Sequence, residues 1–142
     1  MKLAIACDHR GYKLKKYIIK HMKDIEFIDL GANDDNPSDY SEYGIKLGEY
    51  CVKNNIKGIA ICGSGIGISI ACNKVKGVRC GRVASIKDTI ATRKDNDANL
   101  IAFSGDINED RAIRIIEEFI NTEFENDERH LRRINKISKY EK

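Results

Sequence analysis

The chain has 142 residues, of which 42% are hydrophobic, 33% charged and 7% aromatic, and its formal net charge is +3. This length predicts a single domain, residues 1–142, which can bury enough core to fold without metal or disulfides. Because 25 basic residues stand against 22 acidic ones and no long apolar run is present, the composition supports neither nucleic-acid binding nor a membrane span.

Short apolar runs alternate with helical patterns along the chain. We predict strands at residues 3–7, 27–30, 58–62, 78–83 and 100–103, with amphipathic helices between them and a charged last helix at about 127–140. Several of the strand runs are apolar throughout, which is typical of parallel strands covered on both faces. The alternation predicts an α/β fold, a Rossmann-like three-layer α-β-α arrangement with a five-stranded parallel sheet and an extended C-terminal helix.

Ligands of open parallel sheets bind beyond the carboxyl ends of the strands. Asp8-His9-Arg10 follows the first predicted strand, and Cys62 closes the third, before Gly63-Ser64-Gly65-Ile66-Gly67. Ser104-Gly105-Asp106 follows the fifth strand. We expect the first two groups to lie close together.

The glycine loop is the sharpest local motif. Gly63, Gly65 and Gly67 alternate between a strand and a helix, where glycine lets N–H groups face a ligand and the helix adds its positive end. The loop favours a phosphate or a developing oxyanion, although a tight turn without a ligand has the same pattern. It is neither a Walker loop, which needs Gly-Lys-Ser/Thr, nor the dinucleotide fingerprint, which follows the first strand.

The five cysteines are an odd number without a Cys-x-x-Cys pair, which excludes a disulfide framework and a zinc knuckle. Reduced thiols are typical of the cytoplasm, and no signal peptide is visible, so we expect a cytoplasmic protein. Cys62, at a helix N-terminus, could act as a base or nucleophile, but a free cysteine is also a common core residue. The other four cysteines are interpreted as core residues.

Three further segments carry polar side chains. Asp8 and His9 could handle protons or hydroxyl groups, while Asp8 could also serve only as a helix cap. Arg129, Arg132 and Arg133 can share a helix face and bind phosphate, or they can form a solvated surface. The amides and carboxylates of residues 93–99 fit turns and caps, or hydrogen bonds to a sugar.

Taken together, these features resemble the type B ribose-5-phosphate isomerase family, which also contains the galactose-6-phosphate isomerase subunits. The matching segments follow the family order over essentially the whole chain: Cys7-Asp8-His9 with Gly11, Asp39-Tyr40, residues 61–69, Ala71 with Asn73-Lys74, Gly77-Val78-Arg79, residues 96–99, and Arg129-His130 with Arg133. The resemblance implies a metal-independent aldose–ketose isomerase of phosphorylated sugars that needs no cofactor. Ribose 5-phosphate and ribulose 5-phosphate, of the pentose phosphate pathway, are its first expected substrate and product.

The resemblance also implies roles for individual residues. Cys62 would be the base that moves a proton through an enediolate, Ser64 would relay a proton between two oxygens, and Asp95 would take part in ring opening. The implied substrate contacts are Asp8, His9, Tyr43, Gly63, Gly65, Ile66, Gly67 and Asn96, and the implied phosphate contacts are His9, Arg129, His130 and Arg133. The family shares sites between subunits, so we expect a homodimer or homotetramer in which the helix at about 127–140 packs on a partner subunit.

Two positions depart from the family pattern. Asp95 stands where the family has the histidine that opens the sugar ring, and a carboxylate, usually ionised at neutral pH, is a poor proton donor. Asp106 stands where the family commonly has an arginine, and Arg10 or Arg82 could supply that charge. Three alternatives therefore stay open: a six-carbon substrate of the galactose 6-phosphate or allose 6-phosphate type, a non-catalytic phosphosugar-binding homologue, and a thiol-based redox sensor.

Overall fold

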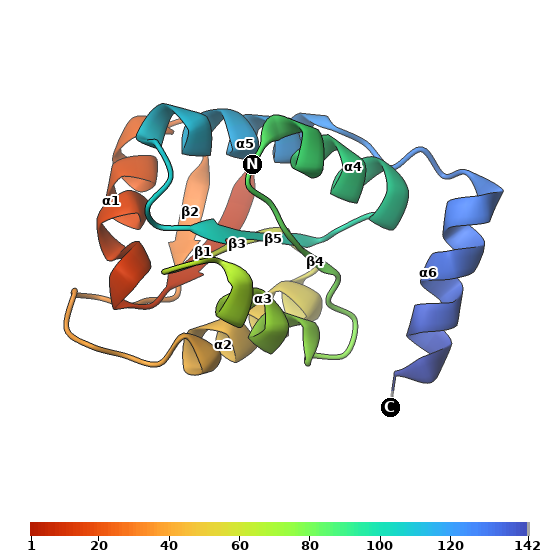
Figure 1. The fold of residues 1–142 in the computed structure, drawn as a ribbon, viewed down its shortest axis with the longest axis horizontal. Helices are drawn as coiled ribbons and strands as arrows, with labels where there is room; N and C mark the ends of the chain where they lie inside the picture. Colours follow the sequence, from red (N-terminus) through yellow and green to blue (C-terminus); the bar gives the residue numbers. More distant parts are fainter. Residues whose placement is uncertain (142) are drawn as a thin grey trace.

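The computed structural model describes residues 1–141 and has one five-stranded parallel sheet. The strands are β1 (Lys2–Cys7), β2 (Glu26–Asp29), β3 (Gly58–Cys62), β4 (Cys80–Arg82) and β5 (Leu100–Ser104), in the order β2-β1-β3-β5-β4. The helices are α1 (Tyr12–His21), α2 (Tyr40–Asn54), α3 (Ile66–Asn73), α4 (Ile86–Asn96), α5 (Glu109–Asn121) and α6 (Glu128–Tyr140), and a short 3-10 turn, η1 (His9–Gly11), follows β1. The predicted three-layer α/β fold is confirmed (Figure 1).

Two cores cover the two faces of the sheet. Figure 1 shows α1, α4 and α5 on one side and α2 and α3 on the other. Along β1, Leu3 and Ile5 join the first core, whereas Ala4 and Ala6 join the second. Because successive strand residues point to opposite faces, a strand between two helix layers must be apolar at every position, as the sequence pattern indicated.

The strand bounds differ slightly from the predicted ones. The fourth strand spans only Cys80–Arg82, although the apolar run begins at Val78. The side-chain oxygen of Asn99 accepts a hydrogen bond from the Arg79 N–H at 2.8 Å, and the backbone N–H of Asn99 donates to the Arg79 carbonyl at 3.0 Å. Residue 79 is therefore bound to Asn99, which precedes β5, and lies outside the regular strand. Leucine and valine positions flanking short strands remain apolar because they still pack on the core.

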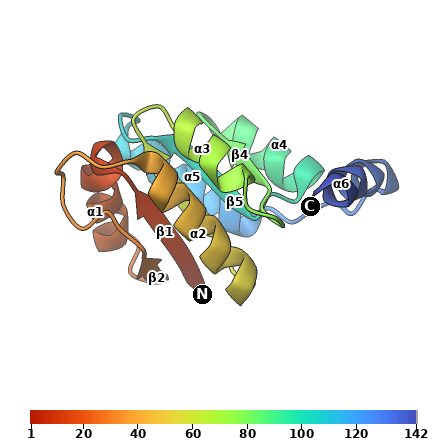
Figure 2. The same ribbon diagram turned by 90° about the horizontal axis from the view of Figure 1, so that it is seen from below.

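Helix α6 lies at one end of the molecule, beyond α4 and opposite α1 (Figures 1 and 2). It begins after Asp127, whose carboxylate accepts the Arg129 N–H at 2.8 Å. Ile134 is buried, whereas Leu131, Ile137 and Tyr140 are 39%, 55% and 83% exposed. Three large side chains exposed on one helix form an apolar surface, and such surfaces are typical of sites that contact another protein.

Every helix among residues 1–141 is too short or too polar to cross a lipid bilayer.

Candidate functional site

A pocket of about 460 Å³ lies where β1 and β3 end. Its lining comprises Asp8, His9, Arg10, Tyr40, Cys62, Gly63, Ser64, Ile66 and Gly67. The predicted neighbourhood of the Asp8-His9-Arg10 group and the glycine loop is therefore confirmed. Both groups occupy the carboxyl edge of the sheet, where parallel strands deliver the residues that follow them.

Cys62 is only 3% exposed, and its Sγ accepts a hydrogen bond from the Gly65 N–H at 3.2 Å. Gly65 has φ +77°, and a Cβ at this position would lie 2.6 Å from the Phe103 carbonyl carbon. Only glycine combines this backbone angle with such a close approach. The turn that presents an N–H to the sulfur therefore depends on a glycine at residue 65.

Residues at the end of β5 form hydrogen bonds to the glycine loop that follows β3. The Ser104 hydroxyl donates to the Gly63 carbonyl at 2.7 Å, and the Gly105 N–H donates to the Cys62 carbonyl at 2.9 Å. The N–H groups of Gly63, Ser64 and Gly67 have no hydrogen-bond partner within residues 1–141. Free N–H groups of this kind at a helix N-terminus can bind a phosphate or stabilise an oxyanion.

His9 is fixed by the loop that precedes α2. Its backbone N–H donates to the Ser38 hydroxyl at 3.1 Å, and its Nδ1 accepts the Ser38 N–H at 3.1 Å. The ring therefore keeps Nε2 as its second hydrogen-bonding atom. Asp8 caps η1 by accepting the Arg10 N–H at 2.9 Å and also lines the pocket, so its structural and functional interpretations are compatible.

Two arginines flank the loop and have different partners. Arg10 lines the pocket beside Gly63, and its Nη2 lies 3.4 Å from Asp106 Oδ2. Arg82 instead donates from Nε and Nη2 to the Ser64 carbonyl, at 3.2 and 3.0 Å. Of the two candidates for the charge lost at residue 106, Arg10 is the one that faces the pocket.

Tyr43, an expected substrate contact, lies outside the Cys62 pocket in the single chain. Tyr43 packs against Gly31 and the second core, and it is absent from the pocket lining. Tyr40 lines the pocket instead and lies against Gly67. Tyr40 is the first residue of α2 and reaches the strand ends, whereas Tyr43 is almost one turn deeper. Tyr40 belongs to the Asp39-Tyr40 match in the sequence, so it becomes a further candidate for a substrate contact.

The remaining predicted site residues form a second group, away from Cys62. His130 Nε2 lies 3.4 Å from Asp95 Oδ1, which joins α6 to the end of α4. Arg129 and Arg133 are exposed on α6. None of these four residues lines the Cys62 pocket. Within one chain, the predicted phosphate-binding arginines and the predicted base are therefore not brought together.

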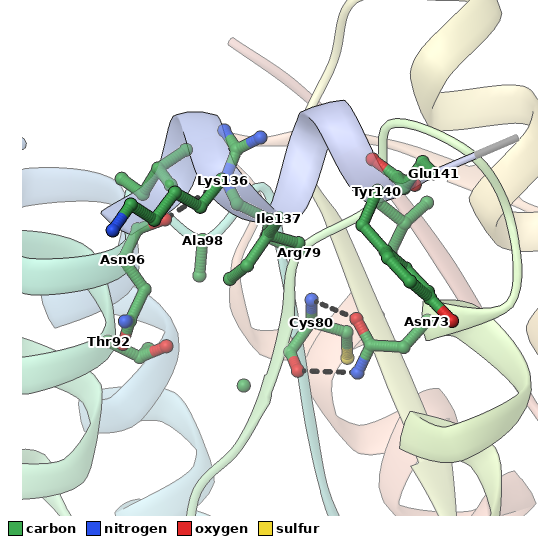
Figure 3. Close-up of a pocket in the computed structure, with 13 residues that line it drawn as sticks. Asn73, Arg79, Cys80, Thr92, Asn96, Ala98, Lys136, Ile137, Tyr140 and Glu141 are labelled. Atoms are coloured by element: carbon green, nitrogen blue, oxygen red, sulfur yellow. Dashed lines mark hydrogen bonds between the residues drawn. The ribbon is translucent and has the colours of Figure 1, made fainter. Parts of the chain in front are cut away.

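Asn96 lines a different groove, of about 690 Å³, between α6 and the body of the molecule (Figure 3). Its apolar lining includes Val78, Ile134 and Ile137, and the exposed Tyr140 of α6 lies at one end of the groove. The Asn73 side chain pairs with the backbone of Cys80 through two hydrogen bonds, which close the floor of this groove. This groove is larger than the Cys62 pocket but mostly apolar, so it suits a protein segment better than a phosphate.

Among the cysteines, Cys62 is the one that lines this pocket. Burial raises the pKa of Cys7 to about 11 and that of Cys51 to about 12. The neighbouring Cys72 thiol and burial hold the pKa of Cys80 well above its usual value. These thiols stay protonated at neutral pH, and none of them lines the Cys62 pocket. Residues 1–141 also bring no three His, Cys, Asp or Glu side chains together in a way that could hold a metal ion.

Comparison with known proteins gives consistent matches over nearly the whole chain. The model of a family described as ribose/galactose isomerase matches residues 3–137. A probable ribose-5-phosphate isomerase B of Mycoplasma genitalium is 40% identical, over 97% of this chain and 94% of the relative.

Solved structures agree with these matches. Ribose-5-phosphate isomerase B of Clostridium thermocellum has a TM-score of 0.93 and 36% identity, over 98% of this chain and 96% of that chain. The Mycoplasma genitalium enzyme with bound ribulose 5-phosphate has a TM-score of 0.92 and 38% identity, over 99% and 95%.

Proposed function

The chain belongs to the ribose/galactose isomerase family, and we propose that it interconverts ribose 5-phosphate and ribulose 5-phosphate. The observation that supports this proposal most strongly is the Cys62 thiol at the end of β3, in a pocket that also contains free loop N–H groups, Asp8 and His9. The relative with bound ribulose 5-phosphate supports the choice of a five-carbon substrate. The reaction requires a reduced Cys62, which fits a protein of the cytoplasm.

In the proposed reaction, Cys62 acts as a base on the open-chain sugar. The thiolate takes the proton from C2, the C–H electron pair forms the C1–C2 double bond, and the carbonyl oxygen O1 becomes an enediolate oxyanion. The N–H groups of the loop stabilise that negative charge. Ser64 passes a proton from O2 to O1, and the Cys62 thiol returns its proton to C1, which completes the ketose.

The substrate phosphate needs cations, and among residues 1–141 the only lysine or arginine that lines this pocket is Arg10, beside the His9 imidazole. We assign the other cations, Arg129 and Arg133, to a second copy of the chain. Helix α6 supports this assignment because it extends from one end with exposed Leu131 and Ile137. On α3, next to the pocket, Ile66 and Ile70 are 51% and 56% exposed and offer an apolar surface for such a helix.

The proposed homodimer therefore shares its two sites between subunits. Helix α6 of one copy covers the pocket of the other and brings Arg129 and Arg133 to the phosphate. We place the Asp95–His130 pair in the same shared site as Arg129 and Arg133, because the contact between Asp95 and His130 links α4 to α6. In this arrangement Asp95 orients His130, and the imidazole supplies the proton donor for ring opening that a carboxylate alone lacks.

A mixed-dimer experiment tests the shared site. We expect Cys62→Ala and the double variant Arg129→Ala/Arg133→Ala to be almost inactive when each is assayed alone. When the two are co-expressed, half of the dimers hold one intact site, so about a quarter of the wild-type rate returns. Asp95→Ala replaces the double variant in a second arm and is expected to complement Cys62→Ala equally well.

The control for this experiment co-expresses Cys62→Ala with Asp8→Ala, whose positions line the same pocket, and no recovery is expected. Absence of recovery with the arginine variant as well, in dimers verified by sedimentation, would show that each site is built within one chain.

Arg10 is predicted to bind the phosphate. Arg10→Ala is expected to raise KM for ribose 5-phosphate about tenfold with little change in kcat, because a charge-assisted hydrogen bond is lost equally from bound substrate and transition state. Steady-state kinetics measures both constants. Arg111→Ala, which removes an exposed arginine from α5, is the matched control. An unchanged KM in Arg10→Ala would assign the phosphate to another place.

A further inference from the structure

We propose that Arg82 is a positioning residue that stabilises the Cys62 thiolate through the peptide group between Ser64 and Gly65. The inference rests on the proposed role of Cys62 as base. The carbonyl of this peptide group accepts two hydrogen bonds from Arg82, at 3.2 and 3.0 Å. The N–H of the same group donates to Cys62 Sγ at 3.2 Å. A guanidinium cation and the reactive sulfur thus bind opposite ends of one peptide dipole.

This arrangement favours a negative sulfur for two reasons. A cation on the carbonyl oxygen polarises the peptide group, so that its N–H becomes a stronger donor. A hydrogen bond to a charged acceptor is also stronger than one to a neutral acceptor, so the N–H stabilises the thiolate more than the thiol. The effect of Arg82 therefore reaches the sulfur without direct contact.

The orientation of the peptide group is the second element of the proposal. Glycine at residue 65 permits a reversed orientation of this group, in which the carbonyl oxygen would point at Cys62. An oxygen next to the sulfur would repel the thiolate. Arg82 holds the carbonyl on the far side, and within residues 1–141 that oxygen has no other hydrogen-bond donor.

The position of Arg82 suits this role. It is the last residue of β4, opposite Ala102 of β5, and the following Val83 N–H donates to the Ala102 carbonyl at 2.8 Å. Its side chain reaches past the end of β5 to the loop after β3. It forms no ion pair within the described chain, whereas Arg10 is paired with Asp106. Arg82 is also absent from the pocket lining, so it positions the loop and does not touch the substrate.

Other charged or titratable groups also surround the sulfur. From the elements packed around the pocket they are Asp8, His9 and Arg10 after β1, Tyr40 of α2 and Cys72 of α3. None of these side chains donates a hydrogen bond to Cys62 Sγ, nor to the peptide group that does. The route through the Ser64–Gly65 peptide group is therefore specific to Arg82.

The test measures how fast iodoacetamide alkylates Cys62, by peptide mass spectrometry between pH 6 and 9. Only the thiolate reacts, and the raised pKa values of Cys7, Cys51 and Cys80 keep those thiols slow. Arg82→Gln is expected to slow alkylation at neutral pH about two- to fivefold, the size of a partly screened charge effect. The whole rate–pH curve moves to higher pH, and the acidic limb of the kcat–pH profile moves with it.

Two further variants complete the design. Arg82→Lys, which keeps the charge, is expected to retain part of the wild-type rate, and it also serves if Arg82→Gln does not fold. Arg114→Gln removes an exposed arginine from α5 and should leave both curves in place. Arg82→Gln and Arg82→Lys curves that coincide with the wild-type curve would overturn the proposal. Alkylation needs no isomerase activity, so a wild-type chain without turnover would refute the proposed function while the Arg82 result still stands.

Discussion

Cys62→Ala is expected to lower the rate of ribose 5-phosphate isomerisation by about a thousandfold or more, while the protein stays folded. Positioned acid–base groups contribute roughly 10²–10⁴ to a rate, and Cys62 is the thiol that lines the pocket. Its sulfur accepts a hydrogen bond from one loop N–H and packs with the second core. A coupled assay of ribulose 5-phosphate formation gives the rate, and circular dichroism confirms the fold.

Cys72→Ala is the matched control, because Cys72 is a fully buried cysteine of the same core that lines no polar pocket. It is expected to lose stability without a comparable loss of kcat. If Cys62→Ala turned over substrate at the wild-type rate, another group would have to be the base.

Gly65→Ala is expected to destabilise the fold by about 2–4 kcal/mol and to abolish most activity. The left-handed conformation alone costs an alanine about 1–2 kcal/mol. The added Cβ would also meet the Phe103 backbone at 2.6 Å, and backbone of a central strand cannot move aside cheaply. Any relaxation shifts the N–H that binds Cys62 Sγ, so stability and catalysis fall together.

Urea unfolding followed by circular dichroism measures the first effect, and the isomerase assay measures the second. Gly63→Ala is the control, because its Cβ would meet only the Arg10 side chain, at 3.5 Å, which is an ordinary contact. A Gly65→Ala protein as stable as Gly63→Ala would mean that the loop adopts another conformation in solution.

The fold was predictable because its signal is local. Continuous apolar runs such as residues 58–62 specify buried parallel strands, and the wide apolar stripe of α5 specifies a helix on the sheet. The carboxyl-edge rule then placed Asp8, His9 and Cys62 in one pocket. Each of these inferences needs only spacing along the chain and the geometry of parallel sheets.

The parts that sequence reasoning missed depend on contacts between distant residues. Lys15 looks like a surface lysine of α1, yet it is 1% exposed, and its ammonium group donates to Asp29 at 2.7 Å and to the Ala32 carbonyl. The contact of Arg82 with Ser64 likewise joins residues 18 positions apart. Tyr40 and Tyr43 differ only in how far along α2 they lie, which the pattern of residues does not specify.

The second group of site residues could not be placed from the sequence, because in the proposed dimer its position relative to Cys62 depends on a second copy of the chain. Arg129, Arg133 and Asp95 were assigned to the same site as Cys62 by resemblance, and in one chain they lie elsewhere. If α6 packs on a second copy, the complete site contains residues of both subunits and forms only in the dimer. A single sequence shows which residues are present, but it does not show which copy provides each of them.

An isomerase assay of the purified wild-type protein over five- and six-carbon aldose phosphates, with a chelator present, tests the proposed activity directly. We expect conversion of ribose 5-phosphate to ribulose 5-phosphate, faster than that of galactose 6-phosphate or allose 6-phosphate. Calorimetric binding of these sugars without turnover of any of them would contradict it and would make the chain a phosphosugar-binding protein.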